Sequence, residues 1–581
     1  MSAALYSLEF SKILKNTSNQ NLLLEYIEKF LTENFADEGY EFSNAQIPEK
    51  DNKRHEYLKN DDLREILDEI KQIWGMLYKN FVDDKSIKYT TLIKNSNPII
   101  IPGGRFREIY YWDSKWIIDG LVSCKMYETA YKSIINLVEL VQRFGFIPNG
   151  TRKYYEKRSQ PPMLISIVND FYENCDEEYK SKMLDSEIIN AMETEYSWWM
   201  KKRSVSIEKN GKKYILNRYF VETNFPRVES MAEDINTFKE YVMNKFNFEL
   251  ADNDESIDFY NKNMLYKHEI NLYGHLKAAA ESGWDFSSRF FTDSEHIHTI
   301  CTNNIIPTDL NAILYHNEMV LSKFFSLDKN NNTLKAEKYT ELANNRKNAI
   351  NEILWSEDCW YDYNIITKTH TNKKFYFSNI MPLIYNIEPP KKSFYNILDL
   401  YREPLFGYKG GIPASEVKNS TQQWDFPNVW PPHQQMLVEY LLRKQESIMA
   451  KHVAQSFYRS VVSKVRDPNG KCTLFYEKYD CSDLNKPGKY GEYEVQTGFG
   501  WTNGVLARFI DIFGDNLTDI ANFTASKINI FGVLKKKLND TENKSDVHGV
   551  INENSNKREK IRSNPEIVDK SEEDVISLRI E

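Results

Sequence analysis

The chain has 581 residues, of which 27% are charged and 41% hydrophobic, proportions typical of a folded globular protein. Its formal net charge of -9 is modest for this length, and no basic cluster dominates the sequence, which argues against nucleic acid as a partner. The sequence contains no apolar run of about eighteen residues, so it predicts no membrane span.

The N-terminal stretch and the cysteines leave the compartment of the protein open. The stretch MSAALYSLEFSKILKNTSNQ lacks a basic start followed by an apolar core, so no secretory signal is evident. The six cysteines include no C-x-x-C pair and no metal-ligand spacing, which disfavours a disulfide scaffold or a zinc site. We expect a soluble protein without a bound metal, either cytoplasmic or secreted through a leader that is not visible here.

Helical periodicity dominates the chain. Apolar residues at helical spacing predict helices at 21–35, 61–80, 116–143, 179–201, 235–248, 271–280, 308–327, 335–354, 432–444 and 446–465. Thr308 is a suitable N-cap for the helix that it begins. In the last of these helices His452 lies near the apolar face, which indicates a buried histidine with satisfied hydrogen bonds rather than a ligand.

Strand signals are few and short. The segment EKNGKKYILNRYF predicts a β-hairpin that turns at Asn210 and Gly211. Many helices separated by long aromatic loops indicate one large all-α domain with its loops gathered at one end. From about Asn539 onward apolar density falls and charge rises, which predicts a disordered tail. The expected plan is an N-terminal segment over 1–19, one domain over 20–535 and a tail over 536–581.

Six loops carry residue types that neither helices nor cores require. They are PGGRFREIYYWDSKW, FGFIPNGTRKYYEKRSQPP, FPRVES, QQWDFPNVWPPHQ, LFYEKYD and GEYEVQTGFGWTNG. Each loop alone is equally compatible with a turn-rich connection, but together they repeat aromatic rings beside carboxylates, arginines and amides. Rings cover the C–H faces of a sugar and the polar groups bind its hydroxyls, so the loops predict a site for a neutral, hydroxyl-rich ligand. The sequence has no G-x-x-x-x-G-K-[ST] and no H-E-x-x-H motif.

A Trp-Asp pair occurs three times in these loops and near them, at 112–113, 284–285 and 424–425. The second pair follows Gly283, a residue that can end a helix because glycine adopts the left-handed conformation without a Cβ penalty. This arrangement presents an acid beside a tryptophan at a helix end. We expect burial beside Trp284 to raise the pKa of Asp285.

The loops resemble the signature stretches of the trehalases, family 37 of the glycoside hydrolases. PGGRFREIYYWDSKW and QWDFPNVWPP resemble its two signatures, and IPNGTRKYYEKRSQPP, ESGWDFSSRF, IIPTDLN, EKYD and QTGFGWTNGV resemble its other blocks in the same order. The resemblance covers roughly residues 20–533. It implies an all-α (α/α)6 toroid of the six-hairpin glycosidase type, with a few short β-hairpins in loops, and inverting hydrolysis of α,α-trehalose to two glucoses. Trehalose and water would be its partners, with no cofactor, and the protein would be a monomer.

The resemblance also assigns roles to individual residues. Asp285 corresponds to the general acid and Glu477 to the general base. Sugar contacts are implied for Arg105, Trp112, Asp113, Asn149, Arg158, Ser159, Gln160, Arg227, Glu229, Gly283 and Glu492. Two features depart from the family pattern: Val228 stands where the family often has proline, and the segment between Arg227 and Asp285 is longer than in bacterial relatives. Both departures affect loops rather than the acid or the base.

An inverting glycosidase needs a protonated carboxylic acid at the glycosidic oxygen and a carboxylate on the opposite face that activates water, about 6.5–9.5 Å away. We expect burial and an ionised Asp113 to keep Asp285 protonated, and neighbouring arginines to keep Glu477 ionised. Spacing alone would make Glu477 a solvated charge at a helix end. Its rivals for the role of base are Glu108, Glu229 and Glu492.

Two other functions remain open from the sequence. One is an all-α toroid glycosidase that acts on another glucoside, such as an α-glucan or a different disaccharide. The other is an inactive trehalose-binding relative, although both expected catalytic carboxylates stand in intact motifs. A phosphorylase is disfavoured because the sequence shows no phosphate cradle.

Overall fold

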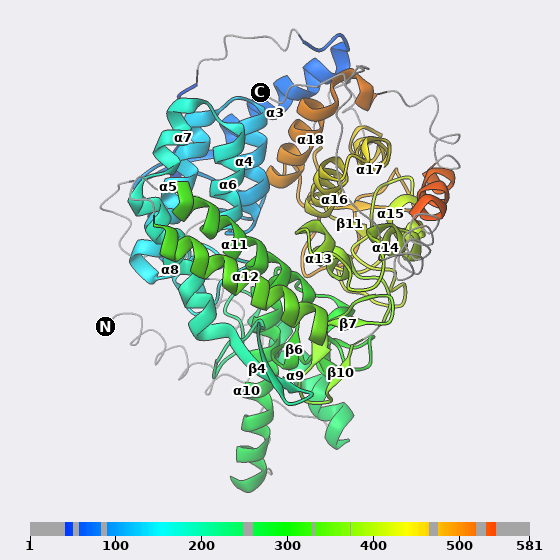
Figure 1. Ribbon diagram of the computed structural model, residues 1–581. Helices are drawn as coiled ribbons and strands as arrows, with labels where there is room; N and C mark the ends of the chain where they lie inside the picture. The colour runs from blue at the N-terminus through cyan, green and yellow to red at the C-terminus, as the bar shows by residue number, and fades with distance from the viewer. Residues whose placement is uncertain are drawn as a thin grey trace, which may run out of the picture.

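Helices make up most of the computed structural model, which describes residues 29, 41–49, 57–82, 90–247, 259–327, 332–371, 373–463, 474–518 and 530–541. Figure 1 shows their arrangement. The helices are α3 (Asp61–Leu77), α4 (Asp113–Ser123), α5 (Tyr127–Phe144), α6 (Leu164–Asn174), α7 (Glu177–Met183), α8 (Ser186–Arg203), α9 (Met231–Phe246), α10 (Phe259–Glu281), α11 (Thr308–Leu327), α12 (Thr333–Ile353), α13 (Met381–Ile384), α14 (Phe394–Leu400), α15 (Arg402–Phe406), α16 (Pro431–Arg443), α17 (Ser447–Val462) and α18 (Gly500–Phe513). A further helix spans 530–541.

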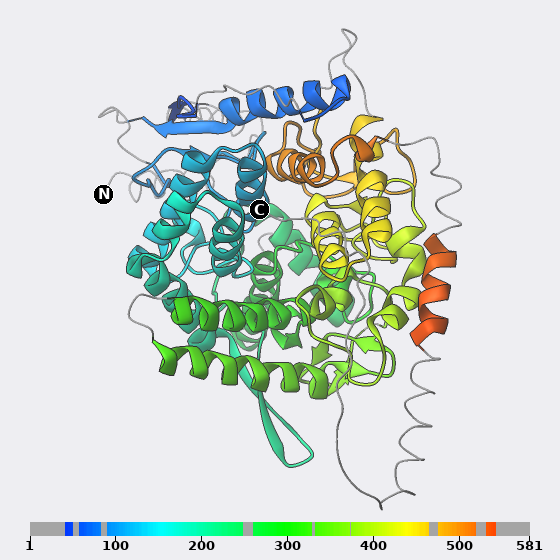
Figure 2. The ribbon, with the colours of Figure 1, turned by 45° about the horizontal axis from the view of Figure 1, so that its top comes forward.

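The strands are short and pair antiparallel in small groups. They are β1 (Phe42–Asn44), β2 (Tyr78–Phe81), β3 (Ile99–Ile100), β4 (Ser204–Lys209), β5 (Lys212–Asn217), β6 (Ile305–Ile306), β7 (Trp355–Ser356), β8 (Cys359–Trp360), β9 (Tyr363–Asn364), β10 (Thr369–His370), β11 (Asn428–Val429) and β12 (Tyr479–Asp480). The predicted hairpin is confirmed as β4 and β5, with φ values of 54° at Asn210 and 72° at Gly211 in its turn. Figure 2 shows the hairpin projecting from the body of the protein.

Six helices of the described chain contact one another in a closed ring. Going round it, α4 packs on α6, α6 on α11, α11 on α13, α13 on α16, α16 on α18, and α18 back on α4 (Figure 1). An outer layer covers the ring: α5 packs on α4, α8 and α12 on α11, α17 on α16, α15 on α17, and α3 on α18. The expected all-α (α/α)6 toroid is therefore the fold of this protein.

Two glycines allow α4 and α18 to approach closely. A Cβ on Gly120 would lie 2.3 Å from the Cα of Gly504, and a Cβ on Gly504 would lie 2.0 Å from the carbonyl oxygen of Trp116. Apolar periodicity in the sequence does not predict α18. Glycine lowers helix propensity by about 1 kcal/mol relative to alanine, but the contact between these two ring helices leaves no room for a side chain.

Three local predictions can be compared with the structure. The single helix expected over 116–143 is wrong, because the chain turns at Lys125, where φ is 58°, and forms α4 and α5. Thr308 is the first residue of α11, and its hydroxyl donates to Asp362 and to the carbonyl oxygen of Ser378 instead of capping the helix. His452 is confirmed as a buried histidine, with Nε2 at 3.0 Å from the carbonyl oxygen of Phe406.

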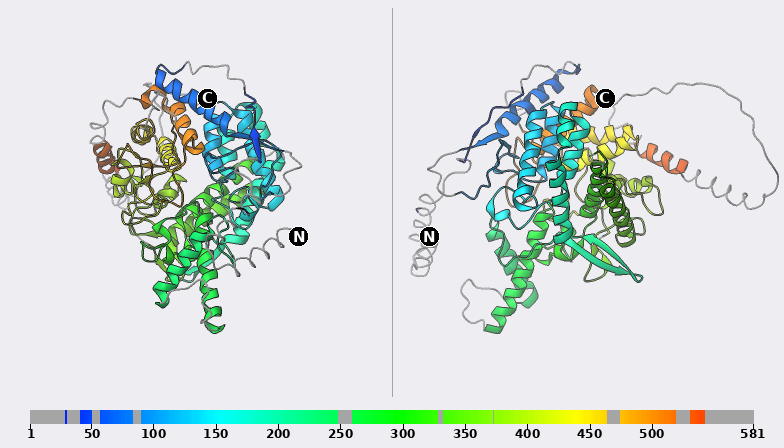
Figure 3. Two further views of the ribbon diagram at one scale, coloured as in Figure 1. Left: turned by 180° about the vertical axis from the view of Figure 1, so that it is seen from behind. Right: turned by 60° about the vertical axis from the view of Figure 1, so that its left-hand side comes forward.

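Other expectations concern the ends of the chain and its long insertion. The segment 1–19, nearly all of the helix expected at 21–35, and the tail beyond 541 lie outside the described residues. The helix at 530–541 crosses the boundary expected at 535, and the division into domains stays a prediction. The long segment between Arg227 and Asp285 contains α9 and α10, which project from the ring (Figure 3). In the described ranges no helix is long and apolar enough to cross a membrane.

Candidate active site

A cavity of about 930 Å³ opens where three ring helices begin. Asp113, the first residue of α4, lines it, as do Trp430 directly before α16 and Phe499 directly before α18. The amino end of a helix carries a partial positive charge, so this end of the toroid suits carboxylates and ligand oxygens. The volume lies within the range of small-molecule sites.

All but one of the site residues expected from the sequence line this cavity. They are Arg105, Trp112, Asp113, Asn149, Arg158, Gln160, Arg227, Glu229, Gly283, Asp285, Glu477 and Glu492. These residues come from loops that are far apart in the sequence. Closure of the helical ring brings the loops to one end of the molecule.

Ser159 is the exception, because it lies behind the cavity wall. Its hydroxyl donates to the carbonyl oxygen of Ile147 at 2.6 Å, and its N–H donates to Glu281 at 3.0 Å. Glu281 in turn forms an ion pair of 2.6 Å with Arg203. Ser159 therefore fastens its loop to the end of α10, and this position does not fit the expected sugar contact.

Asp285 reaches the cavity four residues after α10 ends. Burial raises the pKa of its carboxyl group to about 7, and the Glu492 carboxylate adds to the rise while Arg227 opposes it. The neighbouring carboxylate that contributes most is therefore Glu492, whereas the sequence pointed to Asp113. A carboxyl group with this pKa retains its proton over much of the range up to neutral pH.

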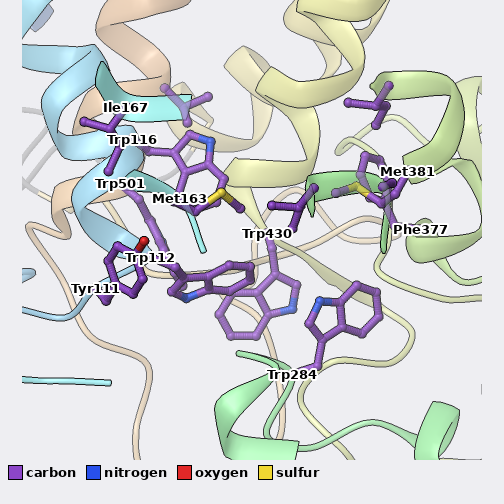
Figure 4. Packing of buried hydrophobic residues seen from close by; sticks show 14 of the residues in the cluster. Tyr111, Trp112, Trp116, Met163, Ile167, Trp284, Phe377, Met381, Trp430 and Trp501 are labelled. Carbon is purple, nitrogen blue, oxygen red and sulfur yellow. The ribbon is translucent and has the colours of Figure 1, made fainter. Parts of the chain in front are cut away.

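Burial is the largest cause of the raised pKa of Asp285, as expected from the sequence, although Trp284 itself does not line the cavity. Its indole is 3% exposed and stacks on Trp424, with ring centroids 5.2 Å apart. Trp424 and Trp430 do line the cavity, and they stack on each other at 3.9 Å. Figure 4 shows the indoles of Trp112, Trp430 and Trp284 in a row. Trp284 thus supports the aromatic wall from behind.

The third Trp-Asp pair also has a structural position. Asp425 is fully buried and accepts hydrogen bonds of 2.9 Å from the hydroxyls of Ser287 and Ser415. It accepts another of 2.8 Å from the N–H of Ser288. Since Ser287 and Ser288 follow Asp285 closely, Asp425 anchors the loop that carries the expected acid. Only the first two pairs place a carboxyl group in the cavity.

Glu477 lines the cavity and is 2% exposed. Its Oε1 accepts a hydrogen bond of 2.7 Å from the Tyr493 hydroxyl, whereas no described residue donates to its Oε2. Its backbone is held on both sides, by the carbonyl oxygen of Gln496 and by the indole N–H of Trp501. Burial raises the pKa of Glu477 above its ordinary value, and Lys478 opposes this rise more than Tyr493 or Arg105 does.

All three rival carboxylates contact an arginine on the cavity wall, and two of them, Glu229 and Glu492, contact Arg158 or Arg227. Glu229 forms an ion pair with Arg158, and although burial opposes it, Arg158 and Arg227 hold the pKa of Glu229 below its ordinary value. Glu492 accepts hydrogen bonds from Arg227 at 2.8 Å and from the Ser230 hydroxyl at 2.7 Å. Both carboxylates therefore have strong partners already.

The third rival, Glu108, belongs to another charged network. It accepts a hydrogen bond of 2.9 Å from the Tyr110 hydroxyl and lies 3.4 Å from Arg152. Arg152 also pairs with Glu41 at 2.7 Å. Among the four candidates for base, Glu477 is therefore the one without a cationic side chain in direct contact within the described structure.

A family comparison agrees with this geometry. The model of the trehalase family matches residues 2–514. The chain belongs to the trehalase family. It is 36% identical to the trehalase of Apis mellifera over 86% of this chain and 77% of the relative, and 34% identical to that of Bombyx mori over 90% and 87%. It is also 34% identical to the trehalase of Homo sapiens, over 87% of this chain and 83% of the relative.

A comparison of structures supports the fold of this trehalase-family protein. The neutral trehalase Nth1 from Saccharomyces cerevisiae superposes with a TM-score of 0.56 and 21% identity, covering 74% of this chain and 75% of that one. Within the described ranges no group of three or more His, Cys, Asp and Glu side chains is placed to hold a metal ion.

Gly283 allows a close contact with Trp112 in this member of the trehalase family. Its φ is 76°, and a Cβ at this position would lie 2.9 Å from the Trp112 ring. The backbone N–H of Trp112 is held by Gln160 at 3.0 Å. Directly after Trp112, the carboxyl group of Asp113 has its pKa raised well above the ordinary value by burial and by Glu477. Because Gly283 has no side chain, the loop of Asp285 can pack directly against Trp112, the residue before α4.

Several cavity residues are missing from the sequence-based set. The most informative are Tyr493, Gln423 and Trp430. Each lies within a loop that the sequence singles out, so the motif indicates the neighbourhood. No sequence signal reports that Tyr493 donates to Glu477 or that Gln423 donates to the carbonyl oxygen of Asp285, because both contacts join distant loops.

Proposed function

We propose that the protein hydrolyses α,α-trehalose to two glucose molecules, with inversion at one anomeric carbon. The observation that carries the proposal is a pair of buried carboxyl groups on one cavity of a trehalase-family protein. Asp285 has its pKa raised to about 7, and Glu477 has one oxygen without a donor among the described residues. A proton donor and a water-activating carboxylate are the two groups that this reaction requires.

The reaction follows from these two groups. Asp285 donates its proton to the oxygen that joins the two anomeric carbons, and the bond from that oxygen to one carbon breaks. A water molecule attacks this carbon from the opposite face while Glu477 accepts one of its protons. One glucose leaves with inverted configuration and the other keeps its own, and proton exchange with water restores both carboxyl groups.

The remaining lining residues suit the two sugar rings. We assign hydroxyl recognition to Asp113, Arg158, Gln160 and Arg227, whose polar groups reach the same cavity. Trp112 and Trp430 offer flat apolar faces for the C–H surfaces of the sugars. Glu229 and Glu492 keep the two arginines oriented through their ion pairs.

A second candidate function is hydrolysis of another glucoside by the same two carboxyl groups. A panel of α,α-trehalose, maltose, isomaltose, sucrose and an α-glucan distinguishes the two. We expect glucose release from trehalose alone. Tight trehalose binding without glucose release would instead support an inactive trehalose-binding protein.

The catalytic assignment is tested by D285N and E477Q. We expect both variants to lose on the order of 10³-fold or more in kcat on trehalose while keeping the thermal unfolding profile of the wild type, because each removes one proton-transfer group. E494Q is the matched control, since Glu494 is exposed in the same loop region and does not line the cavity. Azide added to E477A should restore turnover by replacing the activated water. A wild-type rate in D285N or E477Q would remove that residue from its role.

We further propose that the protein acts as a monomer. The cavity wall, including both carboxyl groups, is built from residues of a single chain. Light scattering on the purified protein should therefore give a mass near 68.5 kDa, the mass of one chain, in fractions that hydrolyse trehalose. Activity confined to a species of twice that mass would contradict the proposal.

A further inference from the structure

Lys478 is a buried cation directly after Glu477, and it does not line the cavity. Its Nζ donates to Oε1 of Gln423 at 2.8 Å and to the carbonyl oxygen of Tyr490 at 2.6 Å. The same Nζ lies 5.3 Å from the ring centroid of Trp430. An ammonium group without solvent is costly unless it is paired and hydrogen-bonded, so these contacts define its position closely.

Gln423 extends the contact from Lys478 to the segment of Asp285. Its Nε2 donates a hydrogen bond of 2.5 Å to the backbone carbonyl oxygen of Asp285. The backbone carbonyl oxygen of Gln423 accepts a hydrogen bond of 2.9 Å from the side-chain amide of Asn428 and one of 3.1 Å from the indole N–H of Trp430. Two consecutive hydrogen bonds therefore connect the residue next to Glu477 with the backbone of Asp285.

The loop that covers Lys478 and Gln423 has glycine at two positions where a side chain would not fit. A Cβ on Gly488 would lie 2.5 Å from Cγ of Lys478, and a Cβ on Gly491 would lie 2.7 Å from Oε1 of Gln423 and 3.2 Å from Nζ of Lys478. Gly491 has a φ of 111°, which favours glycine. The backbone is thus shaped around the Lys478–Gln423 pair.

We propose that Lys478 and Gln423 form a positioning bridge that holds Asp285 and Glu477 in register across the cavity, and that this bridge places a buried cation directly beside the base. This inference rests on the proposed function. Neither part requires Lys478 to touch the substrate. The bridge acts through the backbone of Asp285 and through the charge beside Glu477.

The charged groups around Glu477 determine in which direction Lys478 changes the pKa of Glu477. Burial opposes ionisation of Glu477, whereas Lys478, the Tyr493 hydroxyl and Arg105 favour it, and the charge of Glu477 in turn raises the pKa of Asp113 at the start of α4. Lys478 makes the largest favourable contribution. Burial lowers the pKa of Lys478 itself to about 8, although Glu477 and Asp285 oppose this shift. The cation is therefore present at neutral pH, where the reaction needs the Glu477 carboxylate.

The test compares K478M, K478Q and K478R by steady-state kinetics on trehalose over pH and by thermal unfolding. In K478M and K478Q we expect the acid limb of kcat/KM to move up by about one pH unit, because loss of a nearby cation raises the pKa of Glu477. We also expect kcat to fall on the order of 10²-fold, because the acid and base lose their register. K478R keeps the charge and should keep the wild-type acid limb.

K486M is the matched control, because it removes one positive charge from the same loop at a side chain that is 60% exposed. It should have the wild-type pH profile and kcat. A folded K478M or K478Q with an unchanged acid limb would overturn the proposal, as would loss of the folded state in both, since Lys478 would then serve the fold itself. Wild-type protein that releases no glucose from trehalose would instead reject the proposed function on which the inference rests.

Discussion

The hydroxyl of Tyr493 donates a hydrogen bond of 2.7 Å to Oε1 of Glu477. The guanidinium of Arg105 lies 5.1 Å from the centroid of the same tyrosine ring. The hydrogen bond orients the carboxylate and leaves its other oxygen without a donor among the described residues. Tyr493 is therefore the residue that directs the expected base toward the cavity.

Replacing Tyr493 with phenylalanine tests this orientation. A hydrogen bond to a charged group contributes about 1.5–3 kcal/mol, so we expect Y493F to lower kcat/KM on trehalose by roughly 10- to 100-fold. The pKa of Glu477 should rise, because the hydroxyl lowers it, and the acid limb of the pH profile should move to higher pH. Y490F, at a tyrosine that is 43% exposed in the same loop, is the control. Equal pH profiles for Y493F and the wild type would contradict the assignment.

The alkaline limb of the pH profile should report Asp285. The acid must be protonated, so kcat/KM should fall as the pH rises through about 7. In E492Q the like charge that raises the pKa of Asp285 is gone, and Arg227 is less neutralised. Both changes lower the pKa of Asp285, so the alkaline limb should move to lower pH by about one unit. An alkaline limb that does not move in E492Q would show that Asp285 does not set it.

Two glycines with nearly equal φ values allow the cost of backbone strain to be distinguished from the cost of a steric clash. Gly283 and Gly145 have φ values of 76° and 77°, but only Gly283 has a neighbour, Trp112, in the space of a Cβ. We expect G145A to lower the free energy of unfolding by about 1–2 kcal/mol through backbone strain. G283A should lower it by roughly 3 kcal/mol or more, because the Trp112 ring must also move, and should reduce kcat. Urea denaturation that gives equal values would remove the role of the Trp112 contact.

Replacing the aspartate with alanine should have opposite effects on stability in the Trp-Asp pairs at 112–113 and 424–425. D425A leaves three buried donors without an acceptor, so we expect the free energy of unfolding to fall by about 3 kcal/mol. D113A removes a carboxyl group that faces Glu477 and Asp285, so stability should stay or increase while trehalose hydrolysis falls at least about 10²-fold. Thermal unfolding and glucose release measure both. Similar stability losses in the two variants would contradict this division.

Much of the fold and of the site can be predicted from the sequence, and the reasons can be given for particular elements. Helical periodicity predicts α11 and α12 well, because α12 buries one stripe against α11 and the apolar residues of α11 recur at helical spacing. The same method omits α18, where Gly500 and Gly504 lower helix propensity and only the contact with α4 explains them. The loops that line the cavity are recognisable because their arginines, carboxylates and rings have no other use in a helical core.

The sequence by itself predicted a mainly helical chain and the loops that carry the chemistry, because these depend on residue type and local order, and its resemblance to the trehalases implied Asp285 and Glu477 as the catalytic pair. Only the tertiary structure decided which of three similar Trp-Asp pairs face the cavity, why Ser159 and Trp284 lie behind its wall, and which carboxylates are paired with arginines. Those outcomes depend on contacts between loops that are far apart in the chain. The pKa of a carboxyl group follows from such contacts and from burial, and neither is a property of the local sequence.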